Sequence, residues 1–182
     1  MGNVRGIFGC LASNCRLRRL ALVALFLVLS TAANAETLVG QASVIDGDTV
    51  EIHGQRIRLH GIDAPESSQL CLRGPERYRC GQAAAFALAD RIGEATVTCE
   101  GRERDRWGRL IAVCRARGED LNGWLVRAGW ALAFRRYAED YVPAETEAQR
   151  AGYGMWAGVF VPPWDWRRGV RLADLPGPAA GG

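Results

Sequence analysis

Apolar and polar residues alternate along the stretch that follows residue 36. Three segments, 37–45, 49–53 and 56–62, predict β-strands, since successive side chains of a strand point to opposite faces. One set of alternate positions is apolar and would share a core face: Val50, Ile52, Ile57 and Leu59. Turn-forming dipeptides lie between the segments, at Asp46-Gly47 and at Gly54-Gln55. The folded part of the chain is therefore predicted to begin with three strands joined by tight turns.

Helices are predicted in three later segments: 81–92, 120–132 and 143–156. Asp120 can cap the second of them, and four of its residues form an apolar stripe: Leu121, Trp124, Leu125 and Ala128. The third begins with a proline and has acids in its first turn, as the helix dipole favours.

Two more strands are predicted at 95–100 and 109–116, joined by a charged loop at 101–108, and a loop is predicted at 63–80. The order is then three strands, a helix, two strands and two helices. Five short strands with a few helices favour an α+β, mainly β fold, a five-stranded OB-fold barrel with three helices, over residues 36–160. From 161 to 182 the sequence predicts a tail with a disordered end, in which Trp164 and Trp166 pack back on the barrel rather than form an interaction surface.

Residues 1–35 differ in composition from the rest. Four arginines and no acid precede an apolar run at 20–29, and small residues follow it up to Ala33-Asn34-Ala35. This order is typical of a secretory signal peptide with an A-x-A cleavage site, and the run is shorter than the about 20 residues that a bilayer span needs. We therefore expect export to a periplasm or to the outside, no stable membrane association after cleavage and, by default, a monomer.

Loss of the signal peptide changes the charge of the protein. The whole chain has 23 arginines, no lysine and 20 acids, for a net charge of +3. Without the four arginines of the signal, 19 arginines face 20 acids, so the net charge becomes −1. The mature protein is therefore not a general polycation, and an anionic ligand must be bound by local arginines.

Four cysteines remain after residue 35: Cys71, Cys80, Cys99 and Cys114. An even number in an exported protein predicts two disulfides, for which three pairings are possible. We favour Cys71–Cys80, which closes a short loop, and Cys99–Cys114, across a predicted hairpin. The alternative, a zinc site, lacks a C-x-x-C pair, and the two histidines lie apart from the cysteines.

Three short segments concentrate charged and polar residues: Asp46-Gly47-Asp48-Thr49, RLHGIDAPES at 58–67 and DRWGR at 105–109. Each has an ordinary structural explanation, as a turn, as solvated loop acids around a proline, or as a hairpin tip. Taken together, the three segments also have a functional explanation. Asp48 and Asp63 offer hard oxygen ligands for Ca²⁺, Glu66 can act as a general base, and Arg58 and Arg109 can bind a phosphate. This is the inventory of metal-assisted phosphodiester hydrolysis.

With these segments the sequence resembles the staphylococcal nuclease (thermonuclease) family. VIDGDTV, RLHGIDAPE and DRWGR resemble its three active-site segments, in order and with similar spacing, and the resemblance covers about 38–157. It implies an OB-fold barrel with three helices, cleavage of DNA and RNA, and Ca²⁺ as cofactor.

The resemblance also implies roles for individual residues. Asp48 and Asp63 correspond to the side-chain calcium ligands, and Ala64 stands where a threonine contributes its backbone carbonyl. Glu66 corresponds to the general base, and Arg58 and Arg109 to the arginines that bind the scissile phosphate. Three residues would contact substrate: Arg106 near a terminal phosphate, Trp107 beside the nucleotide in place of a tyrosine, and Tyr137 against the base.

The sequence also departs from the family. Ala64 lacks the threonine hydroxyl, and the loop 67–80 is unlike the lysine-rich loop of the best-known member. We therefore expect an exported calcium-dependent nuclease that acts on DNA and RNA with little sequence specificity and prefers single strands. The alternative is a non-catalytic OB-fold module that binds nucleic acid or a protein, since OB-folds serve many functions.

Overall fold

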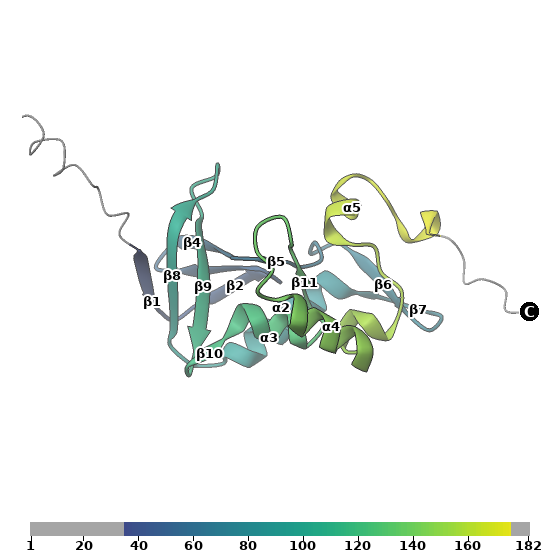
Figure 1. Ribbon diagram of the computed structural model, residues 1–182, viewed down its shortest axis with the longest axis horizontal. Coiled ribbons are helices and arrows are strands. Elements are labelled where there is room, and N and C mark those ends of the chain that lie inside the picture. The colour runs from purple at the N-terminus through teal and green to yellow at the C-terminus, as the bar shows by residue number, and fades with distance from the viewer. Residues whose placement is uncertain (1–34, 176–182) are drawn as a thin grey trace, which may run out of the picture. The chain divides into compact units, whose positions relative to one another are not determined.

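A mixed sheet that curls back on itself forms the centre of residues 35–175, the part of the chain that the computed structural model describes (Figure 1). Its strands are, in spatial order, β1 (Glu36–Gly40), β8 (Val97–Arg104), β9 (Leu110–Ala116), β4 (Gln55–Leu59), β3 (Thr49–Ile52) and β2 (Ser43–Asp46), with β10 (Glu119–Asp120) beside β9. Neighbours are antiparallel except β4 and β9, which are parallel. Because β1 and β2 are consecutive in sequence yet lie at opposite ends of this order, the sheet curls into a barrel.

This arrangement confirms the predicted OB-fold barrel, with one correction to its first strand. The segment 37–45 is two strands rather than one, because β1 pairs with β8 while β2 pairs with β3. The chain changes partner at Gln41-Ala42, where it turns from one end of the sheet to the other. The second turn is also shifted by one residue, since His53 and Gly54 form it and Ile52 pairs with Gln55.

Four α-helices are present among the described residues, one more than predicted: α2 (Cys80–Ile92), α3 (Leu121–Arg127), α4 (Val142–Ala151) and α5 (Pro163–Arg167). The additional helix, α5, lies in the segment predicted as a tail. Short 3-10 helices follow α4 and α5: η1 (Gly154–Ala157) and η2 (Leu172–Asp174). In Figure 1, α2, α3 and α4 cover one side of the curled sheet.

Two predicted helices end earlier than expected. The helix predicted at 120–132 begins under the Asp120 cap, whose carboxylate accepts hydrogen bonds from the N–H groups of Asn122 and Gly123, but it ends at Arg127. Residues Leu132–Ala133 instead form β11, which pairs with β5 (Ile62–Asp63). The helix predicted at 143–156 ends at Ala151, because Gly152 takes a left-handed conformation that terminates it.

The prediction of a loop at 63–80 is wrong for its second half. β6 (Leu70–Arg73) and β7 (Glu76–Arg79) form a hairpin that the Cys71–Cys80 disulfide closes. The backbones of Leu72 and Val159 also form two hydrogen bonds with each other. The N–H of Leu72 donates to the carbonyl oxygen of Val159 with an N to O distance of 2.8 Å, and the N–H of Val159 donates to that of Leu72 at 3.1 Å. The hairpin therefore supports the chain just before α5.

The four residues predicted to share a core face are all buried, at 0–1% exposure. The second disulfide, Cys99–Cys114, lies in the same core and joins directly opposed positions of β8 and β9. Both favoured disulfide pairings are thereby confirmed.

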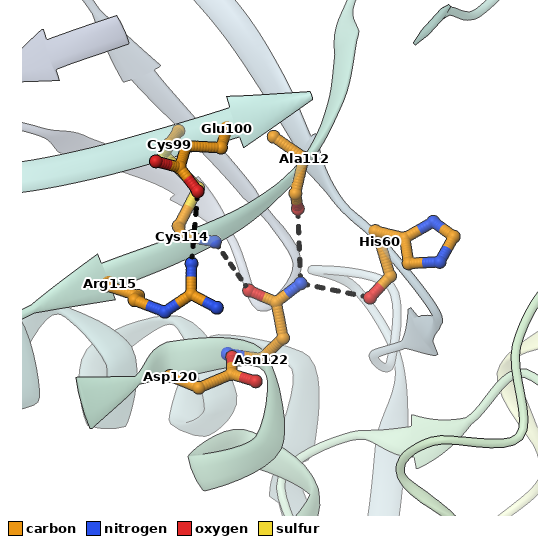
Figure 2. Close-up of a disulfide and its surroundings, with 8 residues drawn as sticks. All are labelled: His60, Cys99, Glu100, Ala112, Cys114, Arg115, Asp120 and Asn122. Atoms are coloured by element: carbon orange, nitrogen blue, oxygen red, sulfur yellow. Dashed lines mark hydrogen bonds and ion pairs between the residues drawn. A yellow bond between two sulfur atoms is a disulfide. The ribbon is translucent and has the colours of Figure 1, made fainter. Parts of the chain in front are cut away.

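Asn122 of α3 is a buried polar residue that ties the helix to the barrel. Its Oδ1 accepts a hydrogen bond from the N–H of Cys114, and its Nδ2 donates to the carbonyl oxygens of His60 and Ala112 (Figure 2). The side chain therefore satisfies backbone groups of two strands at the point where His60 leaves β4.

Replacing Asn122 with alanine is expected to lower the free energy of unfolding by about 3 kcal/mol, because the Cys114 N–H and the His60 carbonyl lose their partner, whereas the Ala112 carbonyl still accepts from the His60 N–H. Urea unfolding monitored by circular dichroism measures this value. The control is Gln41→Ala, which removes an exposed amide that donates to the Glu94 carbonyl. An Asn122→Ala protein as stable as Gln41→Ala would contradict the role of this network.

Residues 1–34 and 176–182 lie outside the described part of the chain, and with them all but the last residue of the predicted signal peptide and the end of the tail for which disorder was predicted. Within residues 35–175, no helix has the length and apolar character that crossing a membrane requires.

Candidate active site

A cleft of about 860 Å³ lies where the β2–β3 turn, the β4–β5 segment, β8, β9 and α5 meet. Seven of the site residues predicted from the sequence line it: Asp48, Arg58, Ala64, Glu66, Trp107, Arg109 and Tyr137. Two do not, Asp63 and Arg106. The three segments that the sequence singled out therefore meet in space around one cleft.

Two buried carboxylates lie at the base of this site. Asp48 is 3% exposed and Asp63 is fully buried, and Arg58 joins them. Its Nη1 donates to Asp48 Oδ1, and its Nη2 donates to Asp63 Oδ1 at 2.9 Å. Burial lowers the pKa of Arg58 from its ordinary value, while Asp63 opposes the shift, and the guanidinium remains a cation. The carboxylates and the arginine therefore form one charged unit.

A tight turn places Asp48 in this unit. The predicted turn at Asp46-Gly47 is one residue off, because Asp46 pairs with Thr49 and the turn is Gly47-Asp48. The Asp48 N–H donates to Asp46 Oδ1 at 3.0 Å, and Asp48 Oδ2 accepts from the Ala64 N–H at 2.7 Å. A side chain at Gly47 would collide with the Cβ atoms of Ala64 and Ala84, at 2.7 and 2.9 Å. Glycine is therefore needed here for close approach rather than for an unusual φ.

Glu66 is held at the mouth of the site by its backbone. Its N–H donates to Gln69 Oε1 at 3.3 Å, and its carbonyl oxygen accepts from the Gln69 N–H at 2.7 Å. The first turn of α2 packs against the same carbonyl, so that a Cβ at Gly81 would lie only 1.9 Å from it. The side chain of Glu66 is 42% exposed. The loop is thus fixed while the carboxylate remains accessible.

The loop between β8 and β9 positions Arg109 through Asp105. Asp105 Oδ1 accepts from the N–H groups of Trp107 and Arg109, and its Oδ2 accepts from Arg109 Nε at 2.7 Å. Burial alone would raise the pKa of Asp105, but these hydrogen bonds outweigh it and place the pKa below its ordinary value. Asp105 thereby stays charged near neutral pH. Among the described residues, none accepts a hydrogen bond from the Nη groups of Arg109, which leaves both for a ligand.

Aromatic side chains border the cleft beside these charges. Trp107 is 66% exposed and lies against two guanidinium groups, with Arg106 at 4.0 Å and Arg109 at 5.1 Å from its ring centroid. Tyr137 is 63% exposed and packs edge to face on Phe134. The structure thus brings Trp107 and Tyr137 to the cleft, and places Arg106 outside its lining.

The structure adds a charged residue of α5 that the sequence analysis missed, Arg167. Its Nη1 donates to Glu66 Oε1 at 2.8 Å and to Asp63 Oδ1 at 3.1 Å, and its Nη2 donates to Asp63 Oδ2 at 2.6 Å. These hydrogen bonds raise the pKa of Arg167 above its ordinary value. The pairing of tryptophans and arginines in PPWDWRR was visible in the sequence, but no spacing rule relates it to Asp63.

The donor atoms of the site fit a hard divalent cation. Asp48 and Asp63 are buried oxygen donors, the ligand type that a hard cation such as Ca²⁺ prefers, and in this structure Arg58 and Arg167 supply the positive charge that balances them. No cluster of three or more His, Cys, Asp or Glu side chains suited to a metal occurs within residues 35–175. A cation here would therefore draw its other ligands from backbone carbonyls and water.

Comparison with known proteins agrees with this geometry. A family model described as a staphylococcal nuclease homologue matches residues 56–158, more than half of the chain. The chain belongs to the staphylococcal nuclease family. The resemblance first inferred from the three active-site segments is confirmed, and membership supports a hydrolytic nuclease.

Several known proteins are similar to this chain over most of their own length. An uncharacterized endonuclease of Haemophilus influenzae is 29% identical over 84% of this chain and 85% of its own, and a micrococcal nuclease of Shigella flexneri is 30% identical over 85% and 94%. The succinoglycan biosynthesis protein ExoI of Rhizobium meliloti is 43% identical over 75% of this chain and 73% of its own.

Proposed function

We propose that this protein is an exported, calcium-dependent nuclease that hydrolyses phosphodiester bonds of DNA and RNA with little sequence specificity. The observation that carries the proposal is one cleft, in a member of a nuclease family, that is lined by the buried Asp48, the accessible Glu66 and several arginines, Arg109 among them. The buried Asp63 adjoins this cleft through Arg58, which binds both aspartates. A module that only binds nucleic acid has no chemical use for the buried carboxylates and Glu66 together.

Each group has a role in this proposal. Asp48, Asp63 and the Ala64 carbonyl would hold Ca²⁺, which supplies positive charge to polarise the phosphodiester when bound. Glu66 would take a proton from the water that attacks phosphorus, while the bond from phosphorus to the leaving oxygen breaks. Arg109 would donate both of its Nη groups to the phosphate oxygens, where charge grows in the transition state.

The substrate class follows from the surface of the cleft. Trp107 and Tyr137 present exposed rings on which unpaired bases can stack, and stacking tolerates any base. We therefore propose a preference for single strands. Export is supported by the two disulfides and by the signal-like residues 1–35.

Cleavage of a labelled single-stranded DNA by the oxidised protein tests the proposal, with a duplex of the same sequence alongside. We expect cleavage in calcium, none above background after a calcium chelator is added, recovery when calcium is returned, and slower cleavage of the duplex. Folded protein that binds the DNA but does not cut it in calcium would favour the non-catalytic binding module.

A further inference from the structure

Arg167 occupies Asp63, one of the two carboxylates at which calcium is proposed to bind. Both oxygens of Asp63 accept hydrogen bonds from it, and so does Glu66. Asp63 itself does not line the cleft, whereas Arg167 does. Together with Arg58, the guanidinium therefore covers Asp63 on the side of the cleft. Arg167 also lies outside the residues 56–158 that match the family model.

The segment that carries Arg167 is anchored at several points. The Val161 carbonyl accepts a hydrogen bond from Nε2 of the fully buried Gln69 at 2.6 Å. Trp164 stacks on Phe134 with a centroid separation of 5.9 Å and an interplanar angle of 6°. Since Gln69 also binds the backbone of Glu66, the same amide links the loop of the candidate general base to the segment leading to α5.

The charges around Asp63 allow it to bind either Arg167 or a divalent cation, but not both. Asp48 and Asp63 carry two negative charges in a buried position, and Arg58 supplies one positive charge. Arg167 supplies a second one, through a bidentate pair with Asp63. A divalent cation on Asp63 needs at least one of the same oxygens and would repel a guanidinium beside it. The two cations therefore compete for one carboxylate.

We propose that Arg167 is an internal cation that binds Asp63 and Glu66 when calcium is absent, and that calcium must displace it to bind. This inference rests on the proposed calcium site. Because the same Nη1 donates to Asp63 and to Glu66, displacement from Asp63 would also weaken the contact with the proposed general base. The apparent calcium affinity is then the intrinsic affinity multiplied by the fraction of protein in which Arg167 is away from Asp63.

Calcium titration by isothermal calorimetry tests this with no dependence on catalysis. The variants are Arg167→Gln, Arg167→Lys and the matched control Arg168→Gln, which removes a neighbouring charge whose only ion pair among the described residues is with Asp165. We expect Arg167→Gln to bind calcium about tenfold more tightly than wild type, because the competing state is removed. The calcium affinity of Arg168→Gln should equal that of wild type. The affinity of Arg167→Lys should lie between those of wild type and Arg167→Gln, since an ammonium cannot form the bidentate pair.

Each outcome is decisive. If wild type binds calcium and Arg167→Gln binds it equally or more weakly, the internal cation is refuted while the calcium site stands. If none of the four proteins binds calcium, both proposals fall. If Arg167→Gln does not fold in chelator, Arg167→Lys carries the test, and an affinity no higher than that of wild type refutes the inference.

Discussion

Replacing Glu66 with glutamine is expected to lower the rate of DNA cleavage about a thousandfold, the range in which a general base contributes. The amide keeps the shape of the side chain but cannot accept the proton of the attacking water. The loop is held by backbone hydrogen bonds to Gln69 and by the approach of Gly81, neither of which involves the carboxylate. The fold and calcium binding should therefore survive.

Single-turnover cleavage of DNA in saturating calcium measures this effect, and calorimetry checks that the metal still binds. Glu76→Gln, at the exposed start of β7, is the matched control and should cleave like wild type. A Glu66→Gln protein that retains a tenth or more of the wild-type rate would remove Glu66 from the mechanism.

Replacing Arg109 with alanine is expected to lower the same rate about 100-fold to 1000-fold, as the loss of one preorganised donor to a developing charge typically does. The residue is fixed by Asp105 through Nε, which leaves its two Nη groups as a fork for phosphate oxygens. Arg109→Lys should recover little of the rate, because a lysine cannot bind Asp105 and the phosphate in this geometry.

Arg127→Ala, which removes an exposed arginine of α3 paired with Glu147, is the control for the loss of charge. Its rate and its thermal midpoint should match those of wild type. An Arg109→Ala protein that is folded and fully active would overturn the assigned phosphate contact.

Much of the barrel could be predicted from the sequence because its strands alternate cleanly. Val50, Ile52, Ile57 and Leu59 are apolar every second residue, and all four are buried in the core. The β6–β7 hairpin could not be predicted in this way. Charged residues occupy three of the four positions of β7, so the strand shows no clean apolar alternation, and a disulfide and backbone bonds to Val159 help to hold the hairpin.

The candidate site, too, could be predicted only in part. Asp48 and Asp63 stand in short segments with local turn chemistry, so their approach could be inferred from the motifs. Arg167 is 104 residues from Asp63 in sequence, and long-range contacts such as Trp164 on Phe134 and Gln69 with Val161 bring it there. Local patterns contain no information on such a contact.

The anchoring of α5 sets the local concentration of the Arg167 guanidinium at Asp63. A guanidinium tethered beside Asp63 has an effective concentration set by the geometry of the chain, on the order of millimolar even for a flexible tether. This value is the same in a dilute and in a crowded solution, because the arginine and the carboxylate belong to one molecule. In the proposed competition, the cation at Asp63 would therefore depend on the amount of free calcium and not on the amount of protein.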